Sequence, residues 1–237
     1  HFPGARLFVA RERGAVVGYA HHTPPFPLVL AQAADPVVDA LGAKLRADRY
    51  AMTSVQGPLT VVERFVSAWP ELASRIERVD RQGLYRLTEV TPAPSVGRLT
   101  LASREHLELL VRWHVAFCAE LQLPEGGEEQ ARRVVEHRVA AKLYYLLVDG
   151  DDVVASAVIT RTLPTGRAVG YVYTPTTRRR HGYASDLVAK LSATILAEGY
   201  QYCCLFTQLE NDTSNRIYQN VGYRWLTEFR HLYFAPD

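Results

Sequence analysis

Arg179, Gly182 and Ala184 stand in an Arg-x-x-Gly-x-Ala spacing within residues 178–184, which read RRRHGYA. This stretch joins a β-rich segment to a strongly periodic helical pattern. The first N–H groups of a helix have no partner within the helix, and the helix dipole places partial positive charge there. A glycine lets a ligand approach the backbone, and a small residue keeps the first turn slim. The spacing therefore predicts a phosphate-type anion site, although an arginine run alone is equally typical of a solvated surface.

A second chemically capable stretch lies at residues 211–223, which read NDTSNRIYQNVGY. The pattern predicts a short helix with Asn211 as its cap. Tyr218 carries a phenol whose ordinary pKa of about 10 keeps it protonated at neutral pH, so it can donate a proton. A simpler interpretation is that Tyr218 only packs, because Ile217 and Val221 share its helix face.

Together these two stretches resemble the signatures of the GCN5-related N-acetyltransferase (GNAT) superfamily. The first resembles its Gln/Arg-x-x-Gly-x-Gly/Ala loop, and the second its Asn-x-x-Ala/Ser-x-x-x-Tyr-x-x-x-Gly-Phe/Tyr helix. The resemblance covers residues 97–234. It implies an α/β (α+β) GNAT fold, with a mixed and mostly antiparallel central sheet flanked by helices. It also implies an acetyl-CoA-dependent N-acyltransferase, in which an amine attacks the thioester directly.

The resemblance further implies roles for individual residues. The pantetheine arm would pair with the strand before the loop, so that a backbone N–H of Val172 or Tyr173 faces the thioester oxygen and stabilises the oxyanion. Tyr218 takes the position of the general acid for the departing thiolate. The residues expected to bind acetyl-CoA are Val172, Tyr173, Thr174, Arg179, Arg180, Gly182, Tyr183, Ala184, Asn211 and Ser214.

The general base is less sharply indicated. Glu210 precedes the capping Asn211 and is the candidate, yet many such glutamates are merely solvated and the superfamily often passes this proton through water. His114 interrupts an apolar helix face and is either an acceptor-site residue or a satisfied core histidine. His21 and His22 show no metal-ligand spacing with other residues, so no metal site is predicted.

Hydrophobic periodicity predicts the elements that position these residues. The expected strands are 98–102, 142–148, 153–162, 167–174 and 200–207, with closing strands in 223–234. The expected helices are 104–122, 128–141, 184–198 and 211–220. The resulting order, β-α-α-β-β-β-α-β-α-β, is the GNAT order.

Residues 1–92 read as a degenerate, truncated copy of the second half, which makes the chain a pseudo-tandem repeat. They are separated from an acetyl-CoA-binding domain at 98–237 by a Pro-rich linker at 93–97. In place of the anion loop stands AQAADP at 31–36, whose carboxylate would oppose a pyrophosphate. The first strand and helix pair of this copy are missing or precede His1, and the lack of an initiator methionine suggests that residues precede it.

Composition bounds the remaining expectations. Of 237 residues, 48% are hydrophobic and 22% charged, which is ordinary for a soluble globular protein. The formal charge of +2 and the lack of a long apolar run predict neither nucleic-acid nor membrane binding. Cys118, Cys203 and Cys204 form no disulfide framework, which favours a reducing cytoplasm.

Several alternatives stay open at this level. The acceptor is a small-molecule or peptide amine, and the protein is a monomer or a homodimer. The acidic stretch Glu125–Glu129 either attracts a cationic amine or is a solvated loop. A longer acyl donor fits the same fold. The alternative from another class is a non-catalytic acyl-CoA-binding sensor or interaction module.

Overall fold

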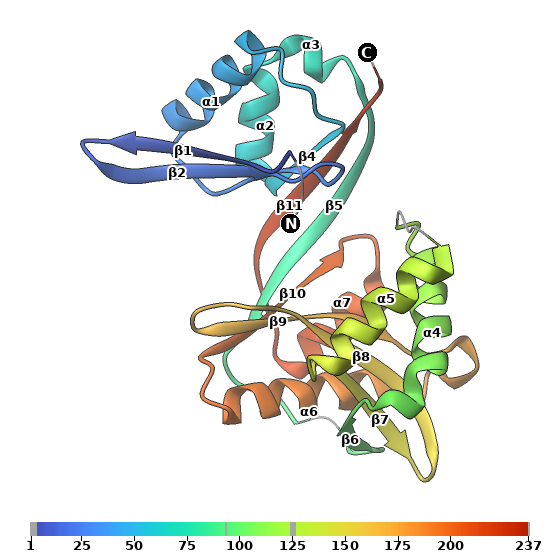
Figure 1. Cartoon of the computed structure of the whole chain (residues 1–237). Coiled ribbons are helices and arrows are strands. Elements are labelled where there is room, and N and C mark those ends of the chain that lie inside the picture. Colours follow the sequence, from blue (N-terminus) through green and yellow to red (C-terminus); the bar gives the residue numbers. More distant parts are fainter. Residues whose placement is uncertain (1–3, 93, 124–126, 237) are drawn as a thin grey trace. The chain divides into compact units, whose positions relative to one another are not determined.

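The computed structural model of the chain describes residues 4–92, 94–123 and 127–236 (Figure 1). These residues form two compact units. The first contains the chain up to Leu84, Thr207–Glu210 and the last strand from Leu226 onward; the second contains Tyr85–Phe206 and Asn211–Trp225. Within the described ranges, no helix has both the length and the apolar character needed to cross a membrane.

The first unit is a sheet with its helices packed into one core. Its strands are β1 (Arg6–Glu12), β2 (Ala15–His22), β3 (Leu28–Leu30), β4 (Ser54–Pro58), β5 (Ile76–Leu87) and β11 (Arg224–Phe234), in the order β1-β2-β3-β4-β11-β5. Its helices are α1 (Asp35–Ala47), α2 (Leu59–Ser67) and α3 (Pro70–Ala73). The core joins the apolar faces of the helices, such as Val38 and Phe65, to strand residues such as Val55 and Leu232.

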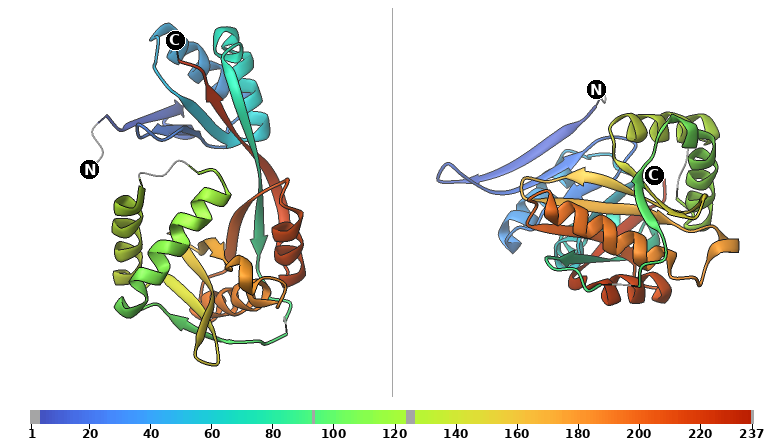
Figure 2. Two further views of the ribbon diagram at one scale, coloured as in Figure 1. Left: turned by 90° about the vertical axis from the view of Figure 1, so that its right-hand side faces the viewer. Right: turned by 90° about the horizontal axis from the view of Figure 1, so that it is seen from below.

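The second unit is a sheet covered by helices on both faces (Figure 2). Its strands are β6 (Arg98–Leu101), β7 (Tyr144–Asp149), β8 (Asp152–Thr162), β9 (Gly166–Tyr173) and β10 (Tyr202–Gln208). Its helices are α4 (Leu107–Glu120), α5 (Gly127–Ala140), α6 (Tyr183–Ala197) and α7 (Asp212–Val221), with short 3₁₀ helices at Arg104–His106 and Thr176–Arg178. The pairs β6–β7, β7–β8 and β8–β9 are antiparallel, whereas β9 and β10 are parallel.

The strand β7 shows why this sheet is covered on both faces. Successive strand residues point to opposite faces, so a run of buried residues needs two cores. Tyr144 and Leu146 pack in the core with α4 and α5. Tyr145 and Leu147 pack in the core with α6 and α7. The helix pair α4–α5 therefore covers one face, and α6 with α7 the other.

The two units repeat one order of elements, as the sequence predicted. In the first, three antiparallel strands, a helix, a parallel strand and a helix follow one another as β1-β2-β3-α1-β4-α2. The second has the same succession in β7-β8-β9-α6-β10-α7. The mixed, mostly antiparallel sheet and the pseudo-tandem repeat are confirmed.

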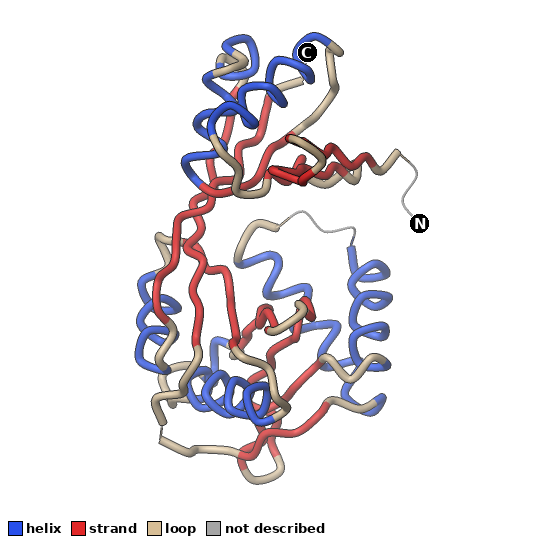
Figure 3. The backbone as a smooth tube through the Cα atoms, turned by 90° about the vertical axis from the view of Figure 1, so that its left-hand side faces the viewer, coloured by secondary structure: helices blue, strands red, loops and turns tan. Residues whose placement is uncertain are grey.

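The end of the chain differs from the prediction. The expected closing strands of 223–234 form one uninterrupted strand, β11 (Figure 3). From Leu226 onward, β11 belongs to the first unit, where Phe229–Tyr233 pair with β4. The physical reason is that β4 is a central strand and needs a ladder partner along each edge. The expected division at 93–97, whose residue 93 lies outside the described residues, therefore does not coincide with the division into units.

Candidate functional site

The strand β9 carries a bulge near its carboxyl end. Val158 and Ser156 of β8 face Gly170 and Tyr173 of β9, so three steps along β9 face two along β8. Such an extra residue is a β-bulge, which bends the strand and re-aims its backbone. Tyr171 lies in this bulge with a left-handed φ of 49°.

The same part of β9 also separates from β10. The parallel pairing joins Gly166–Ala168 of β9 to Tyr202–Cys204 of β10, and within the described strands it does not continue to residues 169–173. The two strands draw apart toward their carboxyl ends (Figure 1). An extended chain can add to a strand edge of this kind by backbone hydrogen bonds. The bulge thus lies where β9 offers an open edge.

The loop after β9 ends in an exposed helix N-terminus. Gly182, the N-cap of α6, has a left-handed φ of 80°, and its carbonyl accepts the first helical hydrogen bond from Asp186 N at 3.0 Å. The N–H groups of residues 183–185 therefore have no carbonyl partner within the helix. A left-handed residue followed by a helical one forms a backbone nest that suits anions. A Cβ at Gly182 would meet no heavy atom within 4 Å, so glycine here meets a conformational need and leaves the space before the helix open.

Thr174 offers a further polar group at this end of β9. The Thr174 hydroxyl is buried and has no hydrogen-bond partner among the described residues. Buried hydroxyls without a partner are uncommon, and each calls for an explanation. A polar ligand lying along the open edge of β9 would supply one.

The arginines of the loop are unequally neutralised. Arg178 Nη2 donates to Asp152 Oδ2 at 2.6 Å, and Arg179 Nη2 donates to Glu120 Oε2 at 2.6 Å. Arg180 is exposed and has no carboxylate partner among the described residues. Arg180 is therefore the arginine of this loop whose charge is available without breaking an ion pair.

Asp186 places a buried carboxylate in the first turn of α6, where it would oppose an anion. It is 1% exposed and accepts from Val96 N at 2.9 Å, Gly97 N at 3.0 Å and Lys190 Nζ at 2.8 Å. Lys190 neutralises the charge of the Asp186 carboxylate, and this carboxylate also accepts hydrogen bonds from the backbone of residues 96–97. The carboxylate therefore anchors this end of the predicted linker to α6 and leaves the N-terminal N–H groups positive.

The side chain of Tyr183 is directed at the β7–β8 turn. Its hydroxyl donates to Asp149 Oδ2 at 2.7 Å, and this hydrogen bond, followed by burial, raises the pKa of Tyr183. His181 Nδ1–H donates to the Arg179 carbonyl at 2.8 Å and its ring stacks on Tyr183. The side chains of 181 and 183 thus fix the loop, and the backbone N–H of Tyr183 is the group that is free to meet a ligand.

The helix α7 begins and ends as its sequence predicts. Asn211 caps it, because its side chain accepts from Ser214 N at 3.0 Å. Gly222 ends it with a φ of 110°, and a Cβ there would lie 2.8 Å from the Glu89 carbonyl oxygen. Tyr218 is 9% exposed, and burial raises its pKa to about 12. Among the described residues, none accepts or donates a hydrogen bond at its hydroxyl.

Comparisons with known proteins agree with this geometry. Residues 145–232 match the family model of FR47-like proteins. A GNAT-family acetyltransferase structure from Colwellia psychrerythraea superposes with a TM-score of 0.69 at 12% identity, covering 98% of this chain and 87% of its own. This chain is a GNAT-fold protein.

Other solved GNAT structures extend the likeness. A GCN5-related N-acetyltransferase from Sphaerobacter thermophilus gives a TM-score of 0.66 at 16% identity, covering 92% of this chain and 76% of its own. A tandem GNAT protein from the clavulanic acid biosynthesis pathway, solved without AcCoA, gives 0.59 at 13% identity, covering 100% of this chain and 86% of its own. No curated protein matches the chain.

Within the GNAT fold, the predicted cofactor residues gather on three neighbouring elements of the second unit. Val172 and Tyr173 end β9, and Thr174 to Ala184 form the loop and the first turn of α6. Asn211, Ser214 and Tyr218 lie at the start and in the body of α7, which packs against α6 in one core. Their role in binding stays a prediction.

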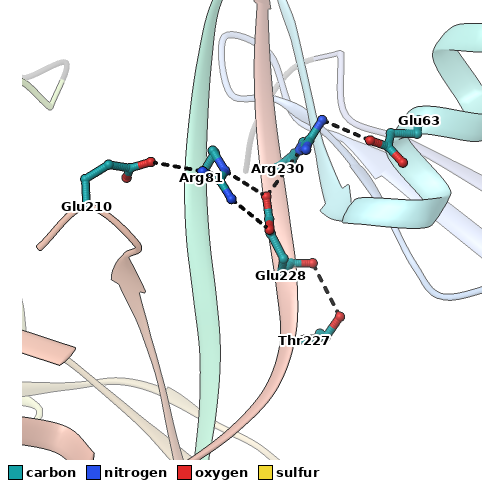
Figure 4. A network of polar contacts seen from close by, with 6 residues as sticks. All are labelled: Glu63, Arg81, Glu210, Thr227, Glu228 and Arg230. Carbon is teal, nitrogen blue, oxygen red and sulfur yellow. Dashed lines mark hydrogen bonds and ion pairs between the residues drawn. The ribbon is translucent and has the colours of Figure 1, made fainter. Parts of the chain in front are cut away.

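Glu210, the predicted base, lies in the first unit within a chain of ion pairs (Figure 4). Its side chain is 63% exposed, and Oε1 lies 3.9 Å from Arg81 Nη1. Arg81 in turn donates to both carboxylate oxygens of Glu228, at 3.0 and 3.3 Å. Arg230 links Glu228 to Glu63. Nothing in the sequence pointed to Arg81, because its partner Glu228 is distant along the chain.

The three histidines that the sequence singled out, His21, His22 and His114, differ in burial. His114 is 3% exposed and stacks on Tyr171, with ring centroids 4.9 Å apart. His22 is buried, lies 2.9 Å from the Tyr50 hydroxyl through Nδ1, and has its pKa lowered by burial. His21 is exposed. Among the described residues, no group of three or more potential ligands gathers around a metal position.

Two other charged segments are neutralised locally. Glu125 of the acidic stretch lies outside the described residues, while Glu128 and Glu129 pair with arginines one turn further along α5. In the first unit, Asp35 begins α1 and lies 3.5 Å from Arg64. The residues between β3 and α1, 31–34, are fewer than the residues 174–182 that precede α6. The first unit thus has an acidic helix start in place of the anion cradle.

Proposed function

We propose that this protein is an acetyl-CoA-dependent N-acyltransferase that moves an acetyl group to an amine acceptor. The observation that carries the proposal is the separation of β9 from β10 directly before the exposed N-terminus of α6. An open strand edge suits the amide-bearing pantetheine arm, and a helix N-terminus suits the pyrophosphate.

Each residue has a distinct role in this proposal. The cosubstrate supplies a thioester carbonyl and a thiolate leaving group. A backbone N–H of Val172 or Tyr173 would stabilise negative charge on that carbonyl oxygen. Tyr218 would donate its proton to the thiolate sulfur as the C–S bond breaks, and it regains a proton from water. The attacking amine forms the new C–N bond and loses its proton to water or to Glu210.

The state of Tyr218 supports this assignment. Burial disfavours the charged phenolate and so raises the pKa of Tyr218 to about 12. The phenol therefore stays protonated throughout the physiological range and is ready to donate. A binding module has no need of such a donor, which favours catalysis over the sensor alternative.

Calorimetry with CoA tests the cofactor site. Gly182→Glu places a carboxylate at the helix N-terminus and should weaken binding at least about tenfold, through like-charge repulsion and loss of the left-handed cap. The matched control is Gly199→Glu, since Gly199 follows the other end of α6 with a φ of 92° and no atom near a Cβ. The proposal fails if the intact protein does not bind CoA, or if both variants weaken binding equally.

Thiol release from acetyl-CoA then separates the enzyme from the sensor. A panel of small amines and peptide N-termini should include at least one that accelerates release of free CoA. Tight CoA binding without accelerated release by any amine would favour the sensor. Competition by longer acyl-CoA thioesters would show whether acetyl is the preferred group.

A further inference from the structure

Tyr171 adopts a backbone conformation that its side chain disfavours. Its φ of 49° is left-handed, a region that β-branched and aromatic residues seldom occupy. It lies in the bulge of β9, one residue before Val172 and two before Tyr173. Strained residues persist only where their surroundings hold them, and they gather at functional sites.

The surroundings of Tyr171 form a clamp of three side chains from α4 and α5. The His114 ring stacks on the Tyr171 ring with an interplanar angle of 18°, and the Phe117 centroid lies 5.0 Å away. The guanidinium carbon of Arg138 lies 4.0 Å from the same ring centroid. Aromatic pairs and cation–π contacts of this kind each stabilise a defined ring position.

Arg138 takes part in this clamp through the face of its guanidinium group. Its Nη1 atom is buried without a hydrogen-bond partner among the described residues. The Arg138 side chain as a whole is half-buried, and its guanidinium lies over the electron-rich face of the Tyr171 ring. The clamp therefore uses the ring itself, and the phenol hydroxyl is not required for it.

We propose that Tyr171 is a positioning residue, whose clamped ring fixes the β9 bulge so that the following backbone N–H groups face the thioester oxygen. This inference rests on the proposed function. In this role the Tyr171 ring acts only through the position of the Val172 and Tyr173 backbone, and it makes no contact with the reacting atoms. Because the N–H contact matters most as charge develops on the oxygen, losing the clamp should lower kcat more than it weakens CoA binding.

Three substitutions at this position separate the ring, the hydroxyl and the backbone conformation. Tyr171→Phe keeps the ring and should leave kcat within about twofold of the parent. Tyr171→Ala removes the clamp but keeps the steric penalty at positive φ, and should lower kcat at least about tenfold with the Kd for CoA within about threefold. Tyr171→Gly removes the penalty, and should show a kcat about fivefold above that of the alanine variant.

A second residue with the same conformation gives the control. Lys142, just after α5, has a φ of 57° and lies outside the clamp. Lys142→Ala and Lys142→Gly should differ in melting temperature, because glycine tolerates positive φ, but should share the parent's kcat and KM for acetyl-CoA. This pair shows what a purely structural left-handed site does.

The outcomes are decisive either way. Equal kcat for Tyr171→Ala and Tyr171→Gly, a loss in Tyr171→Phe as large as in Tyr171→Ala, or a parallel loss of CoA affinity would overturn the inference. Should Tyr171→Ala not fold, Arg138→Met tests the clamp from the other side and should lower kcat about threefold with unchanged CoA affinity. If the parent protein binds and turns over acetyl-CoA, and Tyr171→Ala and Arg138→Met do so with the same kcat, the positioning role of Tyr171 is refuted. The proposed function would still stand in that case.

Discussion

Arg179, in the loop before α6, donates from Nη2 to Glu120 Oε2 at the end of α4, 2.6 Å away. Its Nε also donates to the Thr174 carbonyl at 3.0 Å. The arginine that the sequence assigns to the phosphates is thus held by a carboxylate in the structure. Since both side chains are partly exposed, at 44% and 41%, the pair is weak enough for a phosphate to displace Glu120.

The first prediction concerns this competition. Glu120→Gln should raise the affinity for CoA by about twofold to fivefold, the scale of an exposed ion pair. Calorimetry measures it, and the gain should shrink as salt screens the interaction. The control is Glu198→Gln, which removes the exposed 2.8 Å pair with Arg167 and should not change affinity. A loss of affinity in Glu120→Gln would show that Arg179 acts through Glu120 and does not bind phosphate itself.

The second prediction concerns proton donation. Tyr218→Phe removes the proton donor and should lower kcat by about 100-fold, the usual scale for a general acid, with CoA affinity unchanged. Because the pKa of Tyr218 is raised to about 12, the parent should show no loss of rate from this group as pH rises to about 10. Single-turnover rates across pH test both points. Equal rates for the two proteins at every pH would remove Tyr218 from the mechanism.

The third prediction concerns alkaline stability. Tyr218 and Tyr144 are buried, and burial raises the pKa of each to about 12, above the ordinary value of about 10. The folded state therefore binds these protons more tightly than the unfolded state. Their contribution is fully present below pH 10 and is lost as pH rises toward 12. Denaturant unfolding of Tyr218→Phe should lose about 2 kcal/mol less than the parent over this interval, and an identical loss would contradict the assigned pKa.

Much of the fold could be predicted because the second half follows simple periodicities. Residues Tyr144–Leu147 point alternately into the two cores of the second unit. In the sequence they form a continuous apolar run, which is typical of a strand that is covered on both faces. The caps Asn211 and Gly222 mark the ends of α7 in the sequence as well. Patterns of this kind can be read from the sequence because the residues that cause the structure lie next to one another in the chain.

The rest depends on contacts between distant residues. Nothing local to β11 shows that its second half pairs with β4 in the first unit. The left-handed φ of Tyr171 goes with contacts of its ring to His114, Phe117 and Arg138, which lie on other elements. The ion pairs of Arg178 and Arg179 likewise join residues far apart in the chain. These long-range contacts decide which of the predicted site residues are free to bind a ligand. The sequence could therefore predict the types of residue at the site, but it could not predict which of them are already paired.

The fourth prediction concerns Asp186. Asp186→Ala would leave Val96 N, Gly97 N and the Lys190 ammonium without their shared acceptor. Removing one partner of a buried ion pair is costly, so the free energy of unfolding should fall by about 3 kcal/mol. Denaturant titration measures this fall. Glu129→Ala, which removes an exposed pair with Arg133, is the control and should change it by less than about 0.5 kcal/mol. Equal effects would show that Asp186 does not anchor residues 96–97.

The last prediction ranks the arginines of the loop. Arg180 has no carboxylate partner among the described residues, whereas Arg178 pairs with Asp152 at 2.6 Å. A phosphate gains the full attraction of Arg180 but must replace an existing ion pair at Arg178. Arg180→Gln should therefore weaken CoA binding about tenfold at low salt, and Arg178→Gln about threefold or less. Calorimetry at two ionic strengths tests the order, and both effects should shrink at the higher one. The reverse order would mean that CoA displaces Asp152 and that Arg178 holds the phosphates.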